Sequence, residues 1–127
     1  AKLDIDIPVY YAEINWDNLN RLAERVKIEI TDLHKFTVVR RDLSLLLDEK
    51  ITFAELAETA RRAEKKLLRD VTLFDVYEGK NLPAGKKSYA LSFYLQDTER
   101  TMSDKQIDAI MAKIRKSIED TYGATLR

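Results

Sequence analysis

The chain has no cysteine, a single histidine, two prolines and three glycines among its 127 residues. The lack of cysteine excludes a disulfide scaffold, thiolate zinc sites and cysteine nucleophiles, and one histidine excludes a histidine cluster. Because 22 Lys and Arg residues balance 22 Asp and Glu residues, the net charge is zero and gives no general argument for nucleic acid. No apolar run approaches the roughly 20 residues that span a bilayer, and no signal-peptide pattern opens the sequence. We therefore expect a cytoplasmic protein.

The residue combinations of an active site are missing as well. Gly79 and Gly85 are isolated turn glycines that form no phosphate-binding loop, and no nucleophile is paired with a base. Asp75 and Glu78 share one predicted strand but are ordinary strand-end residues. We expect no catalytic residue, no metal site and no cofactor in this chain.

The first 35 residues have a pattern of their own. Residues 5–14 mix β-branched and aromatic side chains and predict a strand, although no hairpin partner follows. Asn15 or Asp17 can cap a short helix with an apolar stripe. We interpret residues 1–35 as the remnant of a preceding module and a linker; the alternative is an arm packed on the main domain.

Residues 36–127 alternate between strand and helix patterns. Capping boxes at Thr52–Glu55 and Ser103–Gln106 begin two amphipathic helices, and Gly123 ends the second. The order is strand, helix, strand, strand, helix, strand. With right-handed crossovers it predicts an α+β, ferredoxin-like domain with both helices on one face of a four-stranded antiparallel sheet. The expected elements are residues 38–48, 52–67, 71–78, 87–96, 103–122 and 124–126.

Such a sheet has one uncovered face, and the period-two alternation of strands assigns polar residues to it. A polar, partly aromatic sheet suits the unstacked bases of single-stranded RNA. Two other interpretations stay open, since Arg40 and Asp42 can form a plain surface ion pair and the hydroxyls can form an ordinary solvated face. The residues predicted on this face are Arg40, Asp42, Ser44, Ser88, Ser92 and Tyr94.

The connection between the second and third strands carries Lys80, Lys86 and Lys87. Exposed lysines on such a loop can neutralise phosphates, or they can belong to a solvated turn. The second strand is apolar in both phases, so a β-bulge is expected to switch its faces. Tyr77 stays ambiguous, and we expect Phe74 in the core rather than as a stacking platform.

Five segments resemble a known family in order and spacing. They resemble the C-terminal ferredoxin-fold anticodon-binding domain of the bacterial phenylalanyl-tRNA synthetase beta subunit over residues 36–127. The segments are FTVVRRDLS at 36–44, LFDVYEG at 73–79, GKKS at 85–88, RTMSD at 100–104 and GATLR at 123–127.

The resemblance implies a non-catalytic domain that binds the anticodon stem-loop of tRNA(Phe). The implied parent uses ATP and Mg²⁺, relies on the alpha subunit for catalysis, and assembles with it as an (αβ)₂ heterotetramer. Two alternatives stay open: an ACT-like regulatory domain that binds a small molecule, and an architectural docking module. The candidate RNA-binding residues are Arg40, Asp42, Ser44, Lys80, Lys86, Lys87, Ser88, Ser92 and Tyr94.

Overall fold

A computed structural model describes residues 7–26 and 35–127, and the chain divides into two units, residues 1–33 and 34–127. In the first unit, α1 (Trp16–Ala23) is capped by the Asn15 side chain, which accepts a hydrogen bond from the Asn18 backbone N–H at 2.9 Å. The expected helix and its cap are confirmed. Its apolar stripe is exposed, because no residue of α1 is buried.

The strand expected over residues 5–14 is wrong for the part that the structure describes. Residues 7–14 contain no strand, and residues 5 and 6 lie outside the described ranges. The short extended connector expected over residues 27–33 lies outside them as well. A strand needs a partner for its backbone N–H and C=O groups. No described residue pairs with residues 7–14, so these residues do not form a strand despite their β-forming composition.

The second unit is the predicted four-stranded antiparallel sheet with two helices. Its sheet order is β2-β3-β1-β4, which places β1 and β3, the first and third strands of the predicted ferredoxin-like order, in the centre. All three strand pairs are antiparallel. The elements are β1 (Val39–Asp48), α2 (Phe53–Ala63), β2 (Leu68–Tyr77), β3 (Lys86–Leu95), α3 (Asp104–Tyr122) and β4 (Thr125–Leu126).

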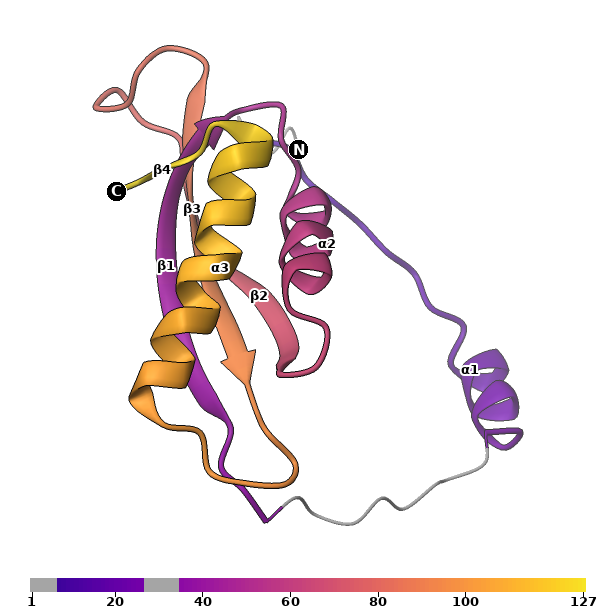
Figure 1. Cartoon of the computed structure of the whole chain (residues 1–127). Helices are drawn as coiled ribbons and strands as arrows, with labels where there is room; N and C mark the ends of the chain where they lie inside the picture. Colours follow the sequence, from indigo (N-terminus) through magenta and orange to yellow (C-terminus); the bar gives the residue numbers. More distant parts are fainter. Residues whose placement is uncertain (1–6, 27–34) are drawn as a thin grey trace. The chain divides into compact units, whose positions relative to one another are not determined.

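Helices α2 and α3 lie side by side on one face of the sheet (Figure 1). Their apolar stripes supply buried side chains to the core, among them Leu56, Ala60, Ile110 and Ile114. Both predicted capping boxes are present, and Gly123 ends α3 in the left-handed conformation, with φ of 61°. Alternate residues of β1 and β3 complete the core. The fully buried side chains include Leu45, Leu47, Leu56, Leu91, Phe93, Leu95, Ile114 and Ile118.

Helix α2 is one turn shorter than its apolar stripe predicts. It ends at Ala63 because Glu64 turns out of the helix, with φ of −133° and ψ of 101°. The Glu64 carboxylate then accepts hydrogen bonds from the backbone N–H groups of Lys66 and Leu67 at 3.1 and 3.3 Å. Such local bonds compete with helical ones. The chain therefore enters β2 at Leu68, three residues earlier than expected.

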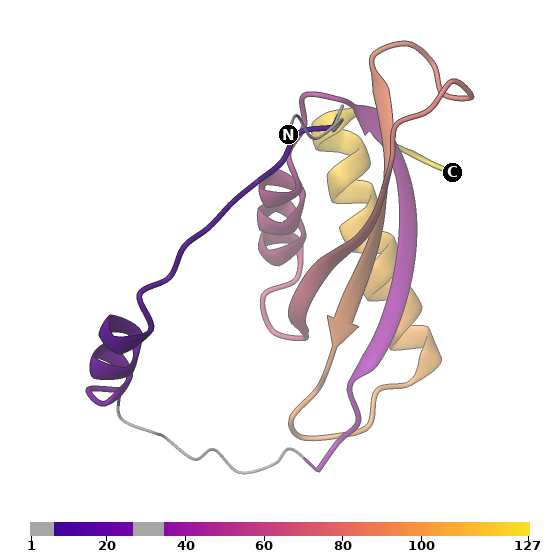
Figure 2. The same ribbon diagram turned by 180° about the vertical axis from the view of Figure 1, so that it is seen from behind.

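No part of residues 35–127 covers the other face of the sheet, as the reverse view shows (Figure 2). This surface is called the open face below. It presents β1 residues of even number together with their register partners on β3 and β2. Separately, no helix in the described part of the chain is long and apolar enough to cross a membrane.

Candidate nucleic-acid interface

The β1–β3 register brings the predicted polar residues together on the open face. Arg40 lies opposite Tyr94 and Asp42 opposite Ser92, one two-residue step apart. Ser44 lies a further step along β1, and its hydroxyl is 3.3 Å from that of Ser88. The grouping of Arg40, Asp42, Ser44, Ser88, Ser92 and Tyr94 on one surface follows from this register.

Arg40 and Asp42 form a two-pronged ion pair. Nε and Nη2 of Arg40 donate to the two Asp42 carboxylate oxygens at 2.9 and 3.1 Å. These hydrogen bonds are the main reason why the pKa of Asp42 lies below its usual value. The nearby Ser92 hydroxyl lowers it further, although its oxygen is not within a well-formed hydrogen bond. The pKa of Arg40 is raised by the same contact with Asp42. Both groups therefore stay charged, and the guanidinium is held in place.

The two serines of β3 are not accessible on this face. Ser88 is 3% exposed and Ser92 is 1% exposed. Neither offers its hydroxyl to a base in this conformation, which departs from the expectation for these two residues. Both serines lie on a central strand, each between register partners on β1 and β2, so the accessible chemistry comes from their neighbours on the open face.

Phe74 is one of those neighbours, and its expected place in the core is wrong. The register of β2 shifts between Leu73 and Asp75, which confirms the predicted bulge and places Phe74 beside Asp75, the register partner of Ala90. Bulges re-aim side chains in this way. The Phe74 ring is 55% exposed on the open face, and the Arg40 guanidinium carbon lies 5.5 Å from its centroid.

Tyr77 forms a second aromatic position on the same face. It lies opposite Ser88 in the register, and the Arg127 guanidinium carbon lies 4.7 Å from its ring centroid. A methyl group at position 79 would overlap the phenol end of Tyr77, so Gly79 leaves the space into which this ring folds. Sequence reasoning left Tyr77 ambiguous and missed Arg127, because no local pattern links the last residue to β2.

The three loop lysines do not form one exposed group. Lys80 is exposed in the β2–β3 loop and Lys86 is half-buried at the start of β3, opposite Asp48. Lys87 is 7% exposed on the helix-covered side, where its ammonium lies 4.5 Å from the centroid of the Tyr89 ring. Its charge also helps to lower the pKa of Glu55, whose main cause is the hydrogen bond from Thr52. The expectation of an exposed Lys87 is therefore wrong.

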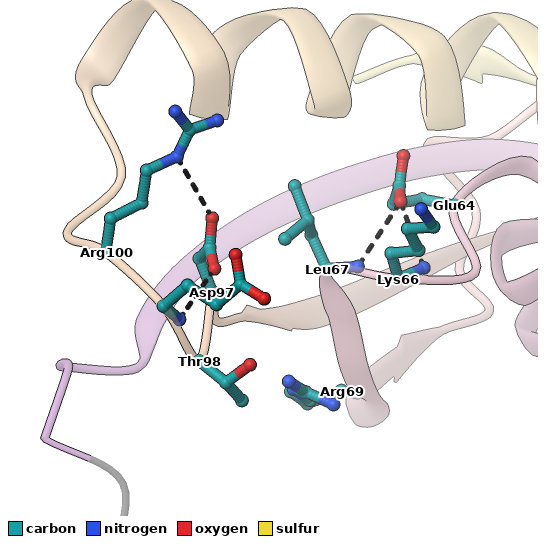
Figure 3. A pocket seen from close by; sticks show the side chains of 8 residues that line it. Glu64, Lys66, Leu67, Arg69, Asp97, Thr98 and Arg100 are labelled. Atoms are coloured by element: carbon teal, nitrogen blue, oxygen red, sulfur yellow. Dashed lines mark hydrogen bonds and ion pairs between the residues drawn. The ribbon is translucent and has the colours of Figure 1, made fainter.

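A cavity of about 450 Å³ lies at the end of the sheet where β3 ends and β2 begins (Figure 3). Burial would raise the pKa of Glu64, but backbone N–H groups and Lys113 together hold it below its usual value. The Glu99 N–H, followed by Arg100, lowers the pKa of Asp97. These contacts stabilise two loops, one between α2 and β2 and one between β3 and α3. The lining residues are Glu64, Lys66, Leu67, Arg69, Asp97, Thr98, Glu99 and Arg100, none of them a predicted RNA-binding residue.

No group of three or more potential metal ligands gathers within residues 7–26 and 35–127. What the open face offers instead is the three rings of Phe74, Tyr77 and Tyr94, two guanidinium groups and several carboxylates. Two of those carboxylates are paired, Asp42 with Arg40 and Asp70 with Arg61 at 3.3 Å. Flat apolar surfaces beside fixed hydrogen-bonding groups are the elements that bind unstacked bases.

Comparison with known proteins gives the family. A chain named phenylalanine–tRNA ligase beta subunit from Porphyromonas gingivalis is 59% identical over 126 residues, covering 99% of this chain and 15% of the relative. The Bacteroides fragilis and Syntrophotalea carbinolica proteins of the same name are 56% and 38% identical, over 98% and 100% of this chain. This chain thus spans about one sixth of these relatives.

A solved amidase of the hydantoinase/carbamoylase family from Burkholderia ambifaria aligns with a TM-score of only 0.42 at 15% identity, over 71% of this chain and 27% of its own, and supports no conclusion. The family model for the ferredoxin-fold anticodon binding domain, in contrast, matches residues 34–127, the whole second unit. The chain therefore belongs to the ferredoxin-fold anticodon binding domain family.

Proposed function

We propose that residues 34–127 bind the anticodon stem-loop of tRNA(Phe) and perform no catalysis themselves. The observation that carries the proposal is the open face, an uncovered sheet surface on which the rings of Phe74 and Tyr77 accompany fixed charged groups. Stacking on aromatic rings tolerates any base, whereas side chains that hydrogen-bond base edges give selectivity. The open face has both kinds of group.

Asp75 supplies the selective element in this proposal. It shares the open face with Tyr77, two residues along β2, and forms no ion pair among the described residues. A carboxylate accepts hydrogen bonds from base amino and imino groups. A base stacked on Tyr77 presents its edge toward Asp75, so donor-bearing bases are favoured. Arg40, Asp42 and Tyr94 form a neighbouring surface for the next nucleotide, and Ser44 supports it from β1.

A stem-loop titration tests this function. The chain is titrated with the labelled anticodon stem-loop of tRNA(Phe) and with a matched stem-loop whose three anticodon bases are replaced, each at two salt concentrations. We expect tighter binding of the cognate stem-loop, and weaker binding of both at higher salt. Equal affinities would refute base recognition. No binding, together with a thermal shift on adding an amino acid, would favour an ACT-like regulatory domain instead.

Lys80 and Lys87 should behave differently in that titration. Removing exposed Lys80 with Lys80→Ala is expected to reduce the slope of log affinity against log salt by about 0.7, the value for one phosphate contact on a single strand. Lys87→Met keeps the length of a buried side chain and should leave the slope unchanged. Salt titrations of both variants beside the wild type measure this, and a lower slope for Lys87→Met would return that residue to the RNA-binding group.

The parent protein is proposed from its relatives. We propose that it is a phenylalanine–tRNA ligase beta chain, because proteins of that name match nearly all of this chain. Its activity would be ATP- and Mg²⁺-dependent attachment of phenylalanine to tRNA(Phe) in the cytoplasm, with catalysis in an alpha subunit and an (αβ)₂ assembly. Co-purification of the full-length beta chain with its alpha subunit, followed by aminoacylation with and without residues 34–127, tests this assignment.

Residues 1–35 are proposed to belong to the preceding part of that parent chain and its linker. The exposed apolar side chains of the first unit, among them Tyr10, Tyr11 and Trp16, fit a segment that packs elsewhere in the longer protein. Deleting residues 1–33 is expected to leave the thermal midpoint of the remaining domain unchanged within about 2 °C, because the second unit has its own core. Differential scanning calorimetry measures it. A fall of more than about 5 °C would indicate an arm packed on the domain.

A further inference from the structure

The side chains of Arg127 and Tyr77 meet on the open face, although their backbones lie at opposite edges of the sheet. Its backbone is held at the β4 edge, where its N–H donates to the Ser44 carbonyl at 3.1 Å directly after the Leu126–Leu45 pair. Tyr77 lies on β2, the strand at the opposite edge. Side chains from the two opposite edges of the sheet therefore meet over its central strands, where the Arg127 guanidinium carbon lies 4.7 Å from the centroid of the Tyr77 ring.

The two arginines over aromatic rings on this face are held very differently. Arg40 is fixed by two hydrogen bonds to Asp42. Within residues 7–26 and 35–127, the Arg127 guanidinium has no carboxylate at ion-pair distance and forms no side-chain hydrogen bond, and it lies over the Tyr77 ring alone. The Tyr77 ring is half-buried, and a cation over such a ring is held weakly compared with a guanidinium on a phosphate. The backbone of Arg127 is thus fixed, whereas its guanidinium can leave the Tyr77 ring for another partner.

The location of Arg127 in the fold is suitable for contact with the phosphate backbone of a bound RNA. The C-terminus lies at the same end of the sheet as the β2–β3 loop, which carries the exposed Lys80 (Figure 1). A base that stacks on Tyr77 needs the ring surface that the guanidinium now covers. The displaced cation then lies next to the phosphate of that same nucleotide, and it gives up no ion pair within residues 7–26 and 35–127 to get there.

We propose that Arg127 is a phosphate-binding residue of the anticodon site, held over Tyr77 in the free protein and transferred to the backbone phosphate of the nucleotide that stacks there. The inference rests on the proposed function and adds to it a specific contact. It predicts that this one residue couples base stacking to backbone binding.

Neutral-backbone stem-loops test the contact directly. Anticodon stem-loops with a single methylphosphonate at each loop position are titrated against the wild type, Arg127→Gln and Arg127→Lys. For the wild type we expect one linkage whose neutralisation weakens binding about tenfold. Arg127→Gln should weaken binding of the unmodified stem-loop by a similar factor, lower the salt slope by about 0.7, and lose the penalty at that linkage. Arg127→Lys should keep the slope.

Lys116→Gln is the matched control, because it removes an exposed cation from α3 on the helix side. It should leave affinity and slope unchanged. If the wild type fails to bind any stem-loop, the proposed function is overturned. If the wild type binds normally and Arg127→Gln shows the same affinity, slope and methylphosphonate profile, only the role of Arg127 is overturned. A penalty at the same linkage in both proteins likewise refutes it.

Discussion

Tyr77→Leu is expected to weaken binding of the anticodon stem-loop by roughly 5- to 150-fold, the range that corresponds to one base–aromatic stack of about 1–3 kcal/mol. The substitution removes the ring that lies on the open face under Arg127 while keeping an apolar side chain of moderate size. Fluorescence anisotropy with a labelled stem-loop measures the loss, and thermal unfolding of the same variant confirms that the fold is retained.

Two further variants separate stacking from base reading. Tyr77→Phe keeps the ring and should retain affinity within about threefold, because stacking needs the π-face rather than the hydroxyl. Asp75→Asn should reduce the preference for cognate over altered anticodons more than Tyr77→Leu does, because it changes an acceptor at the base edge. If Tyr77→Leu binds as tightly as the wild type, the stacking role of this ring is wrong.

Phe93→Ala is expected to lower the free energy of unfolding by about 3–5 kcal/mol. Phe93 is completely buried, and as the register partner of both Arg41 and Val71 it lies on the central strand between β1 and β2. Loss of the ring leaves a cavity in the core, because the surrounding helices and strands relax only partly into the empty space. Urea denaturation followed by circular dichroism measures the change.

Phe74→Ala provides the matched control for this stability prediction. It removes the same side chain from the same sheet, but the Phe74 ring is largely exposed. The expected loss is below about 1 kcal/mol, accompanied by weaker binding of RNA. Similar stability losses for the two variants would contradict the assignment of Phe93 to the core and Phe74 to the open face.

The fold was predictable because each element has its own local signal. Thr52 and Ser103 begin the helices, Gly123 ends the second, and the alternation along β1 assigns Leu45 and Leu47 inward. The position of Lys87 follows from the alternation that turns Tyr89 and Leu91 inward along β3, whereas the position of Phe74 was not predictable in this way. The place of Phe74 depends on where the register shifts in β2, and that shift is set by pairing with β3 rather than by the residues around Phe74.

The candidate site was predictable as a surface but not residue by residue. Arg40, Asp42 and Tyr94 lie where period-two alternation puts them. Alternation says which way a side chain points, however, and not how much its neighbours cover it, so the burial of Ser88 and Ser92 could not be foreseen. The contact between Arg127 and Tyr77 joins opposite sheet edges, and it exists only once all four strands are assembled.

The bulge in β2 also limits how this domain can associate with others. Strand β2 is the outer strand of the sheet, and a regular outer strand offers a row of unpaired N–H and C=O groups to which a foreign strand can bind. The register shift at Phe74 interrupts that row halfway along. Sheet extension and fibre-like self-assembly are thereby disfavoured at this edge by the same irregularity that turns an aromatic ring toward solvent.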